Sequence, residues 1–144
     1  MIVYTGGTFD LLHVGHLELL AGCRALAGVG GRVVVGLNRD EFVERYKGRV
    51  AVQPFERRRE MLLALRDVDA VVTNLGDESS RLAIDVVGPD VIVIGDDWLD
   101  PEAPDPQARY LCQLGIDREW LGERGLRVEY LARTRGTSTT ALRA

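Results

Sequence analysis

The sequence has little cysteine and no apolar run long enough to cross a membrane. A membrane-spanning helix needs ~20 consecutive apolar residues, and no charged and apolar leader precedes the first apolar segment. The two cysteines, Cys23 and Cys112, fit a reducing compartment and predict neither a disulfide nor a catalytic thiol. From these absences we expect a cytoplasmic protein with no membrane partner.

The chain also lacks an excess of positive charge. It carries 18 Lys and Arg against 22 Asp and Glu, which gives a net charge of −4 at pH 7. A general nucleic-acid surface needs a basic face, so we expect no nucleic-acid partner. A locally positive cleft that binds phosphate is still compatible with this charge.

What the sequence does contain is a regular alternation of strand and helix patterns. Strands are predicted over residues 2–5, 32–37, 70–72, 91–94 and 127–131. Apolar residues between them recur at helical spacing, as at Leu20, Cys23 and Ala27. This order predicts an α/β fold, a doubly wound five-stranded parallel sheet with helices on both faces. The length fits one domain over residues 1–144.

The most informative segment is GGTFDLLHVGH at residues 6–16, where a glycine-rich turn leads from the first strand into a helix. His13 and His16 are three residues apart and share one face of the first helical turn. A helix amino end attracts anions, and Gly15 lets a bulky ligand approach the backbone. No nearby residue completes a zinc site. From these residues alone, phosphate binding and simple helix capping both stay open.

Three motifs carry a resemblance to a known family. The string around His13 and His16 resembles the HxGH signature of the nucleotidyltransferase superfamily. Residues 133–140, RTRGTSTT, resemble the RTxGxSTT motif of its cytidylyltransferase branch, and residues 95–98, GDDW, resemble glycerol-3-phosphate cytidylyltransferases. The resemblance implies a Rossmann-like nucleotidyltransferase fold. It covers most of the chain except about residues 99–125, which look like an insertion.

The resemblance implies direct in-line transfer of a nucleoside monophosphate, in which positioning and charge stabilisation do most of the catalysis. His13 and His16 would bind the triphosphate and stabilise charge as the α–β bond breaks. Lys47, with Arg49 as the alternative, would bring a cation from a polar loop. Arg133 would grip phosphate oxygens through its planar guanidinium.

The resemblance also implies a set of nucleotide-binding residues: Gly7, Thr8, Phe9, Gly15, Asp96, Asp97, Thr134, Ser138 and Thr139. Mg²⁺ is expected to bind mainly through the triphosphate, because it retains waters and takes substrate oxygens as ligands. We therefore predict no metal site made by the protein itself.

On this resemblance the expected activity is a cytidylyltransferase that uses CTP and glycerol 3-phosphate to form CDP-glycerol. One alternative is an adenylyltransferase acting on a sugar phosphate, phosphopantetheine or FMN. A second is a nucleotide-binding sensor without turnover. A homodimer is a further expectation from the family.

The segment 99–125 and Arg58 each have two possible interpretations. The segment 99–125 begins with a proline-rich stretch and continues with apolar residues at helical spacing. It is either an acceptor-side lid or an elaboration that stabilises the fold or a dimer contact. Arg58, on a predicted middle helix, is either an active-site residue or part of a solvated helix face.

Overall fold

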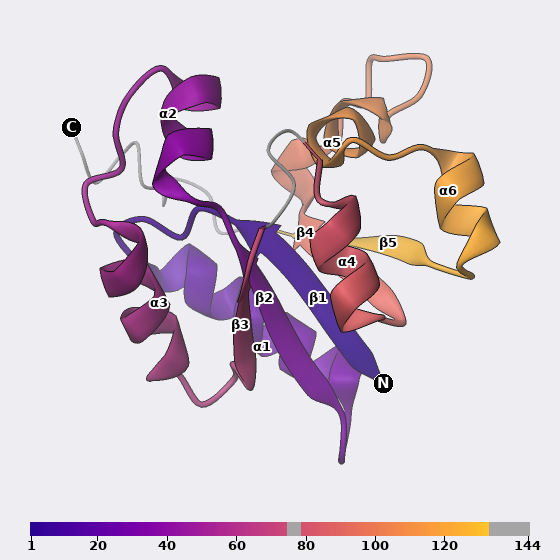
Figure 1. Ribbon diagram of the computed structural model, residues 1–144. Coiled ribbons are helices and arrows are strands. Elements are labelled where there is room, and N and C mark those ends of the chain that lie inside the picture. The colour runs from indigo at the N-terminus through magenta and orange to yellow at the C-terminus, as the bar shows by residue number, and fades with distance from the viewer. Residues whose placement is uncertain (75–78, 133–144) are drawn as a thin grey trace.

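The strands form one sheet in which every pairing is parallel. The computed structural model describes residues 1–74 and 79–132, and within them the strand order is β3-β2-β1-β4-β5 (Figure 1). The strands are β1 (Ile2–Gly7), β2 (Arg32–Leu37), β3 (Ala70–Thr73), β4 (Val91–Gly95) and β5 (Arg127–Leu131). This confirms the predicted α/β fold, and three of the strands run one or two residues beyond their predicted ends.

Helices connect successive strands. They are α1 (Val14–Ala27), α2 (Asp40–Lys47), α3 (Phe55–Leu63), α4 (Arg81–Val87), α5 (Ala108–Leu114) and α6 (Arg118–Glu123), with a 3₁₀ turn, η1 (Asp96–Trp98). No helix among the described residues is both long and apolar enough to cross a membrane.

Each face of the sheet is covered, because side chains alternate along the strands. On one face Val3 and Val91 pack with Cys23 of α1. On the other, Tyr4 and Ile92 pack with α4, α5 and α6. Helices α1 and α4 accordingly lie on opposite sides of the sheet (Figure 1).

The predicted apolar stripe of α1 is confirmed, since Leu20, Cys23 and Ala27 are all buried. Both cysteines are free thiols. Burial, with the nearby charge of Asp67 as a lesser cause, raises the pKa of the Cys23 thiol to about 12. Cys23 therefore behaves as a core residue and not as a nucleophile.

The segment 99–125 has the predicted organisation. Its proline-rich start forms turns, and short helices α5 and α6 follow. Five of its residues are buried in the core on one face of the sheet: Tyr110, Leu111, Leu114, Trp120 and Leu121. The segment is therefore part of the folded core.

Helix α2 begins without a side-chain cap, although Asn38 and Asp40 flank its cap position. The cap position is Arg39, and it makes no side-chain capping hydrogen bond. Asn38 and Asp40 instead bind partners elsewhere in the site described below.

Candidate functional site

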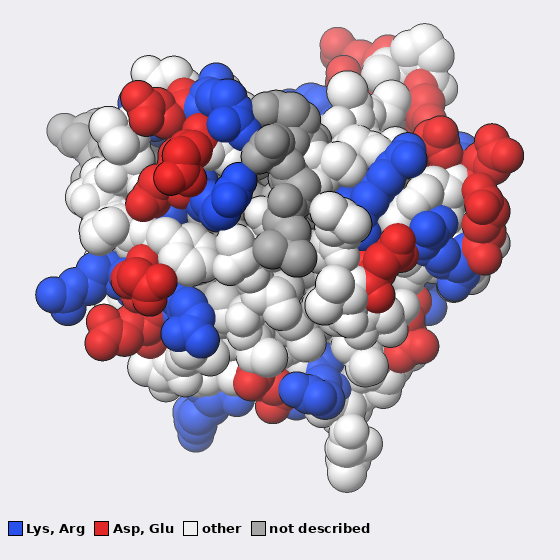
Figure 2. Space-filling view, viewed as in Figure 1, with Lys and Arg blue, Asp and Glu red and all other residues white. Residues whose placement is uncertain are grey.

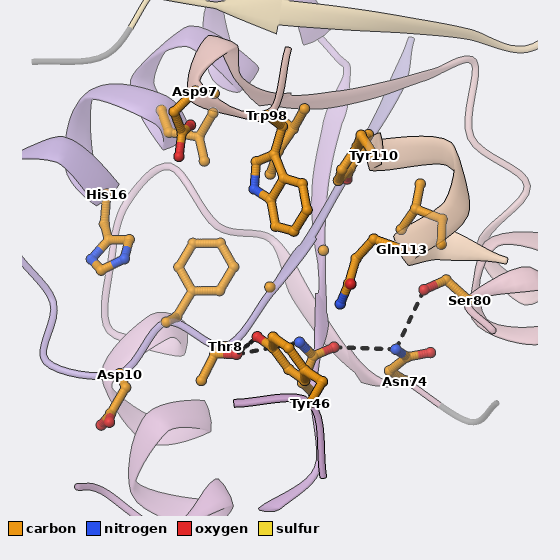
Figure 3. Close-up of a pocket in the computed structure, with 18 of the residues that line it drawn as sticks. Thr8, Asp10, His16, Tyr46, Asn74, Ser80, Asp97, Trp98, Tyr110 and Gln113 are labelled. Carbon is orange, nitrogen blue, oxygen red and sulfur yellow. Dashed lines mark hydrogen bonds between the residues drawn. The ribbon is translucent and has the colours of Figure 1, made fainter. Parts of the chain in front are cut away.

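A cavity of about 350 Å³ opens at the carboxyl ends of the strands (Figure 3). In sheets of this topology the crevice at the carboxyl ends of the strands is where ligands bind. Strand register explains which residues meet there. Gly7 pairs with Leu37, and Leu37 pairs with Thr73. The residues that follow these strand ends, Thr8, Asn38 and Asn74, therefore lie side by side and all line the cavity.

His13 and His16 form a reciprocal cap at the start of α1. His13 Nδ1 accepts a hydrogen bond from the Gly15 amide at 3.1 Å, and His16 Nδ1 accepts one from the His13 amide at 3.2 Å. The two rings stack with centroids 3.9 Å apart. A nitrogen that accepts a hydrogen bond carries no proton, so each neutral imidazole holds its proton on Nε2 and presents it as a donor.

The geometry makes helix capping and phosphate binding, the two roles that the sequence left open, compatible with each other. Capping through Nδ1 fixes the tautomer that makes Nε2–H a hydrogen-bond donor, and both histidines line the cavity. The helix amino end adds its own preference for negative charge. This end of the cavity is suited to phosphate oxygens.

The turn between β1 and α1 has an unusual backbone. Phe9 and Leu11 have φ values of 48° and 52°, a left-handed conformation that costs side-chain-bearing residues energy. Asp10 holds the turn, because its buried carboxylate accepts the amides of Val52 at 2.7 Å and Gln53 at 2.9 Å. The loop after α2 therefore fixes the turn that carries the histidines.

Arg58 fits neither of its two predicted roles. Its side chain is fully buried, and its guanidinium donates to the carbonyls of Thr8 at 2.8 Å and Asn38 at 2.9 Å. It also pairs with the Asp40 carboxylate at 2.6 Å. Arg58 is a structural clamp that holds the ends of β1 and β2 together under the cavity.

A chain of polar side chains crosses the floor of the cavity. The Thr8 and Tyr46 hydroxyls are 2.8 Å apart, and Asn38 Nδ2 donates to Thr8 Oγ1 at 3.3 Å. Asn74 Nδ2 then donates to Asn38 Oδ1 at 3.1 Å and to Ser80 Oγ at 3.4 Å (Figure 3).

Of this chain, only Thr8 was among the predicted site residues. Asn38, Tyr46, Asn74 and Ser80 were missed, although Asn38 and Asn74 each directly follow an apolar strand. That position, one residue past the carboxyl end of a strand, was the available sequence signal. Burial is the largest effect on Tyr46 and raises the pKa of its hydroxyl.

Most of the other predicted site residues meet at the cavity. The lining includes Gly7, Thr8, Phe9, His13, Gly15, His16, Lys47 and Asp97. Asp96 and Arg49 are exposed and are not among the lining residues. Arg133, Thr134, Ser138 and Thr139 lie outside the described residues.

The charge on the surface is mixed. On the face in Figure 2, acidic and basic side chains are interspersed. The ion pairs of the protein include Arg124–Asp85 at 2.7 Å and Arg118–Asp105 at 2.8 Å. Within residues 1–74 and 79–132, no group of three or more His, Cys, Asp or Glu side chains could hold a metal ion.

The parallel sheet, with a histidine pair capping the helix that follows β1, defines the nucleotidyltransferase class of fold. Residues 4–144 match the model of the Cytidylyltransferase-like family. The chain belongs to this family, which confirms the resemblance first seen in the motifs.

Two relatives illustrate its neighbourhood. The chain is 39% identical to the bifunctional protein HldE of Citrifermentans bemidjiense over 98% of its own length, which is 26% of that relative. It is 42% identical to the FAD synthase of Pyrococcus abyssi over 66% of this chain and 62% of that one. The chain thus spans about a quarter of the first relative and under two thirds of the second.

Two solved structures share the fold. The lipopolysaccharide core biosynthesis protein from Thermoplasma volcanium superposes with a TM-score of 0.66 at 21% identity, covering 95% of this chain and 98% of that one. Pantothenate synthetase from Thermus thermophilus gives a TM-score of 0.57 at 14% identity, over 93% and 56% of the two chains.

Proposed function

We propose that this chain transfers an adenylyl group from ATP to a phosphorylated small molecule and releases pyrophosphate. The observation that supports nucleotidyl transfer most strongly is the reciprocal cap of His13 and His16, in which Nδ1 of each imidazole accepts a backbone amide at an anion-favouring helix end and Nε2 carries the proton. Support for ATP comes from the 42% identity to an FAD synthase, because the product in that name contains an adenylyl group.

The proposed reaction is a single in-line displacement. An oxygen of the acceptor phosphate attacks the α-phosphorus of the nucleotide, a new P–O bond forms, and the bond to the bridging α–β oxygen breaks. Pyrophosphate leaves with the bonding electron pair. His13 and His16 would donate Nε2–H to phosphate oxygens as charge develops, an effect worth ~3 kcal/mol for one preorganised donor.

Other residues would position the reactants. Lys47, at the end of α2 and on the lining of the cavity, would bring its ammonium to the phosphates. Asp97 lines the cavity beyond β4 and would face the nucleoside. Arg133, Ser138 and Thr139 stay proposed triphosphate ligands from the family motif.

Mg²⁺ would accompany the triphosphate. The Asp10 carboxylate is already used by two backbone amides, so the described residues favour a metal held mainly by substrate oxygens. The ion would neutralise charge on the leaving pyrophosphate.

The second candidate function is cytidylyl transfer from CTP to glycerol 3-phosphate. It is favoured by the GDDW and RTxGxSTT motifs and by the family to which the chain belongs. The two candidates share the histidine cap and the reaction, and they differ in the nucleoside and the acceptor.

The deciding experiment measures pyrophosphate release with each of the four nucleoside triphosphates and Mg²⁺. The acceptors are glycerol 3-phosphate, a hexose 1-phosphate, FMN and phosphopantetheine, and the nucleotidyl product is identified by mass. ATP-dependent product supports the proposal, and CTP-dependent product moves the second candidate ahead. If the folded protein binds nucleotide but releases no pyrophosphate, the result would indicate a nucleotide-binding sensor.

A further inference from the structure

The cavity has two chemically different ends. In Figure 3, His16 lies at one side, while Asn74 and Ser80 lie at the opposite side. We call the second end the acceptor lobe and define it by Asn38, Asn74, Ser80, Tyr110 and Gln113, all of which line the cavity. If the phosphates occupy the histidine end and the nucleoside faces Asp97, which lies on the same side as His16 in Figure 3, the lobe is left for the body of the acceptor molecule.

Resting on the proposed nucleotidyl transfer, we propose that Gln113 is a specificity-determining residue that selects an acceptor rich in hydroxyl groups, such as a sugar or polyol phosphate. Gln113 comes from α5, within the segment 99–125. Its amide points into the cavity, across from the Asn74 and Tyr46 side chains (Figure 3). This assigns the segment 99–125 to one wall of the acceptor lobe.

The chemistry of the lobe matches hydroxyl groups. A primary amide offers two donors and one acceptor, and a hydroxyl can pair with either. Asn74 Oδ1 and the Tyr110 hydroxyl are buried and have no hydrogen-bond partner within the part of the chain that the structure describes. Buried polar atoms are normally paired, so a ligand that brings hydroxyls to this lobe would satisfy them.

Helix α5 is held firmly enough to act as a specificity wall. Tyr110, Leu111 and Leu114 anchor it in the core. The Ser80 amide donates to the Leu114 carbonyl at 2.8 Å, which ties α5 to the start of α4. The Arg109 guanidinium donates to the Asp97 carbonyl and stacks 5.0 Å from the Trp98 ring centre, which ties α5 to the loop after β4.

These ties place Gln113 on a fixed element between two loops of the site. A polar group on a rigid element discriminates well, because an analogue that lacks its partner leaves the buried group unpaired. A flat aromatic acceptor would stack on the Tyr110 ring and gain little from an amide at this position. The two acceptor types therefore differ in how they respond to Gln113.

The experiment uses the whole chain with ATP or CTP, whichever the wild type turns over, and a graded set of acceptors. The set is glycerol 3-phosphate, ribose 5-phosphate, a hexose 1-phosphate with its monodeoxy analogues, and phosphopantetheine. Gln113→Leu should raise the KM for the best hydroxyl-bearing acceptor roughly tenfold, the loss of one hydrogen bond. The KM for the nucleotide should stay within about twofold of wild type, because the amide faces the other end.

A deoxy analogue supplies the sharper readout. The analogue that lacks the hydroxyl bound by Gln113 should be a poor acceptor for the wild type, and Gln113→Leu should erase that difference. Gln107→Ala is the matched control, since Gln107 lies at the start of the same helix and is not among the lining residues. It should leave both KM values unchanged.

Three outcomes overturn the inference and leave nucleotidyl transfer standing: an unchanged acceptor KM in folded Gln113→Leu, a wild type that prefers phosphopantetheine, or a deoxy penalty that persists in the variant. Absence of any nucleotidyl product from the wild type with every acceptor contradicts the proposed function itself, and the inference falls with it. Thermal melting of each variant identifies loss of folding.

Discussion

The two ends of the cavity are built in different ways. At the histidine end, His13, Gly15 and His16 satisfy one another within four residues of sequence. At the acceptor lobe, Asn38 follows β2, whereas Asn74 and Ser80 lie in the connection from β3 to α4, and the three residues meet only because the strands are in register. A local motif therefore specifies the phosphate end, whereas the fold specifies the acceptor end.

This difference explains how one reaction can be kept while substrates vary. Phosphate binding by the histidine pair, as proposed above, would depend on a cap that a single strand-turn-helix unit can carry. Under the proposal, acceptor recognition would depend on side chains from the connections after β2 and β3 and from helix α5, which can change independently of the cap. The identity to an FAD synthase and the motifs that resemble those of cytidylyltransferases would then be compatible in one chain.

The largest effect is expected from a variant of Arg58, which joins Thr8 after β1 to Asn38 after β2. Arg58→Ala leaves two strand-end carbonyls without a donor and Asp40 without its partner. Loss of such a buried network should lower the free energy of unfolding by ~3–4 kcal/mol, measured by urea denaturation. Arg59→Ala, on the exposed side of α3, is the control and should cost less than ~0.5 kcal/mol. Equal effects of the two variants would mean that Arg58 is no clamp.

The next variant separates capping from catalysis at the histidine end. His16→Ala should lower turnover at least ~100-fold through loss of a preorganised donor, and it also removes the bond to the His13 amide. His16→Gln keeps a side-chain acceptor for that amide, as in an ordinary capping box, and should restore the melting temperature but not the rate. Wild-type turnover by His16→Gln would show that the imidazole serves the helix alone.

The histidine end of the cavity could be predicted from the sequence, because its residues interact with near neighbours in the chain. The strands, the α1 stripe and the helices of segment 99–125 follow from periodicity and were predicted. The structural role of Arg58 could not be predicted from the sequence. Three adjacent arginines on a helix resemble a solvated face, and only the tertiary structure buries Arg58, the middle one. The Thr8–Asn38–Asn74 line was missed, because its members lie in register only once the sheet order is known.

A smaller effect is expected on the sheet beneath the acceptor lobe. A Cβ added at Gly36 would lie 1.9 Å from the hydroxyl of Tyr4, which is fully buried and cannot give way. Gly36→Ala should therefore cost ~1–3 kcal/mol of stability by overpacking. Adding Tyr4→Phe removes the clashing hydroxyl and should recover part of that loss in urea denaturation. A double variant no more stable than Gly36→Ala would place the strain elsewhere.

The smallest effect should come from Tyr46→Phe, which removes a hydrogen bond to Thr8, the residue between the two ends of the cavity. Thr8 follows the turn toward the histidines, and its hydroxyl also contacts Tyr46 at 2.8 Å and Asn38 at 3.3 Å. Tyr46→Phe removes one of these bonds and should cost ~1 kcal/mol. Because burial raises the pKa of the Tyr46 hydroxyl, it stays neutral near neutral pH, and the variant should not change the pH profile there.

The substrate dependence of Tyr46→Phe then tests the division of the cavity. Gln113→Leu is expected to change the KM of the acceptor alone, and His16→Gln mainly the rate. Since Thr8 joins the two ends, loosening it should raise the KM of nucleotide and acceptor by similar small factors, measured in one kinetic series. A change confined to the KM of the acceptor would assign Thr8 and Tyr46 to the acceptor lobe. The part of the site that a local motif specifies would then begin only after Thr8, the first residue of the turn.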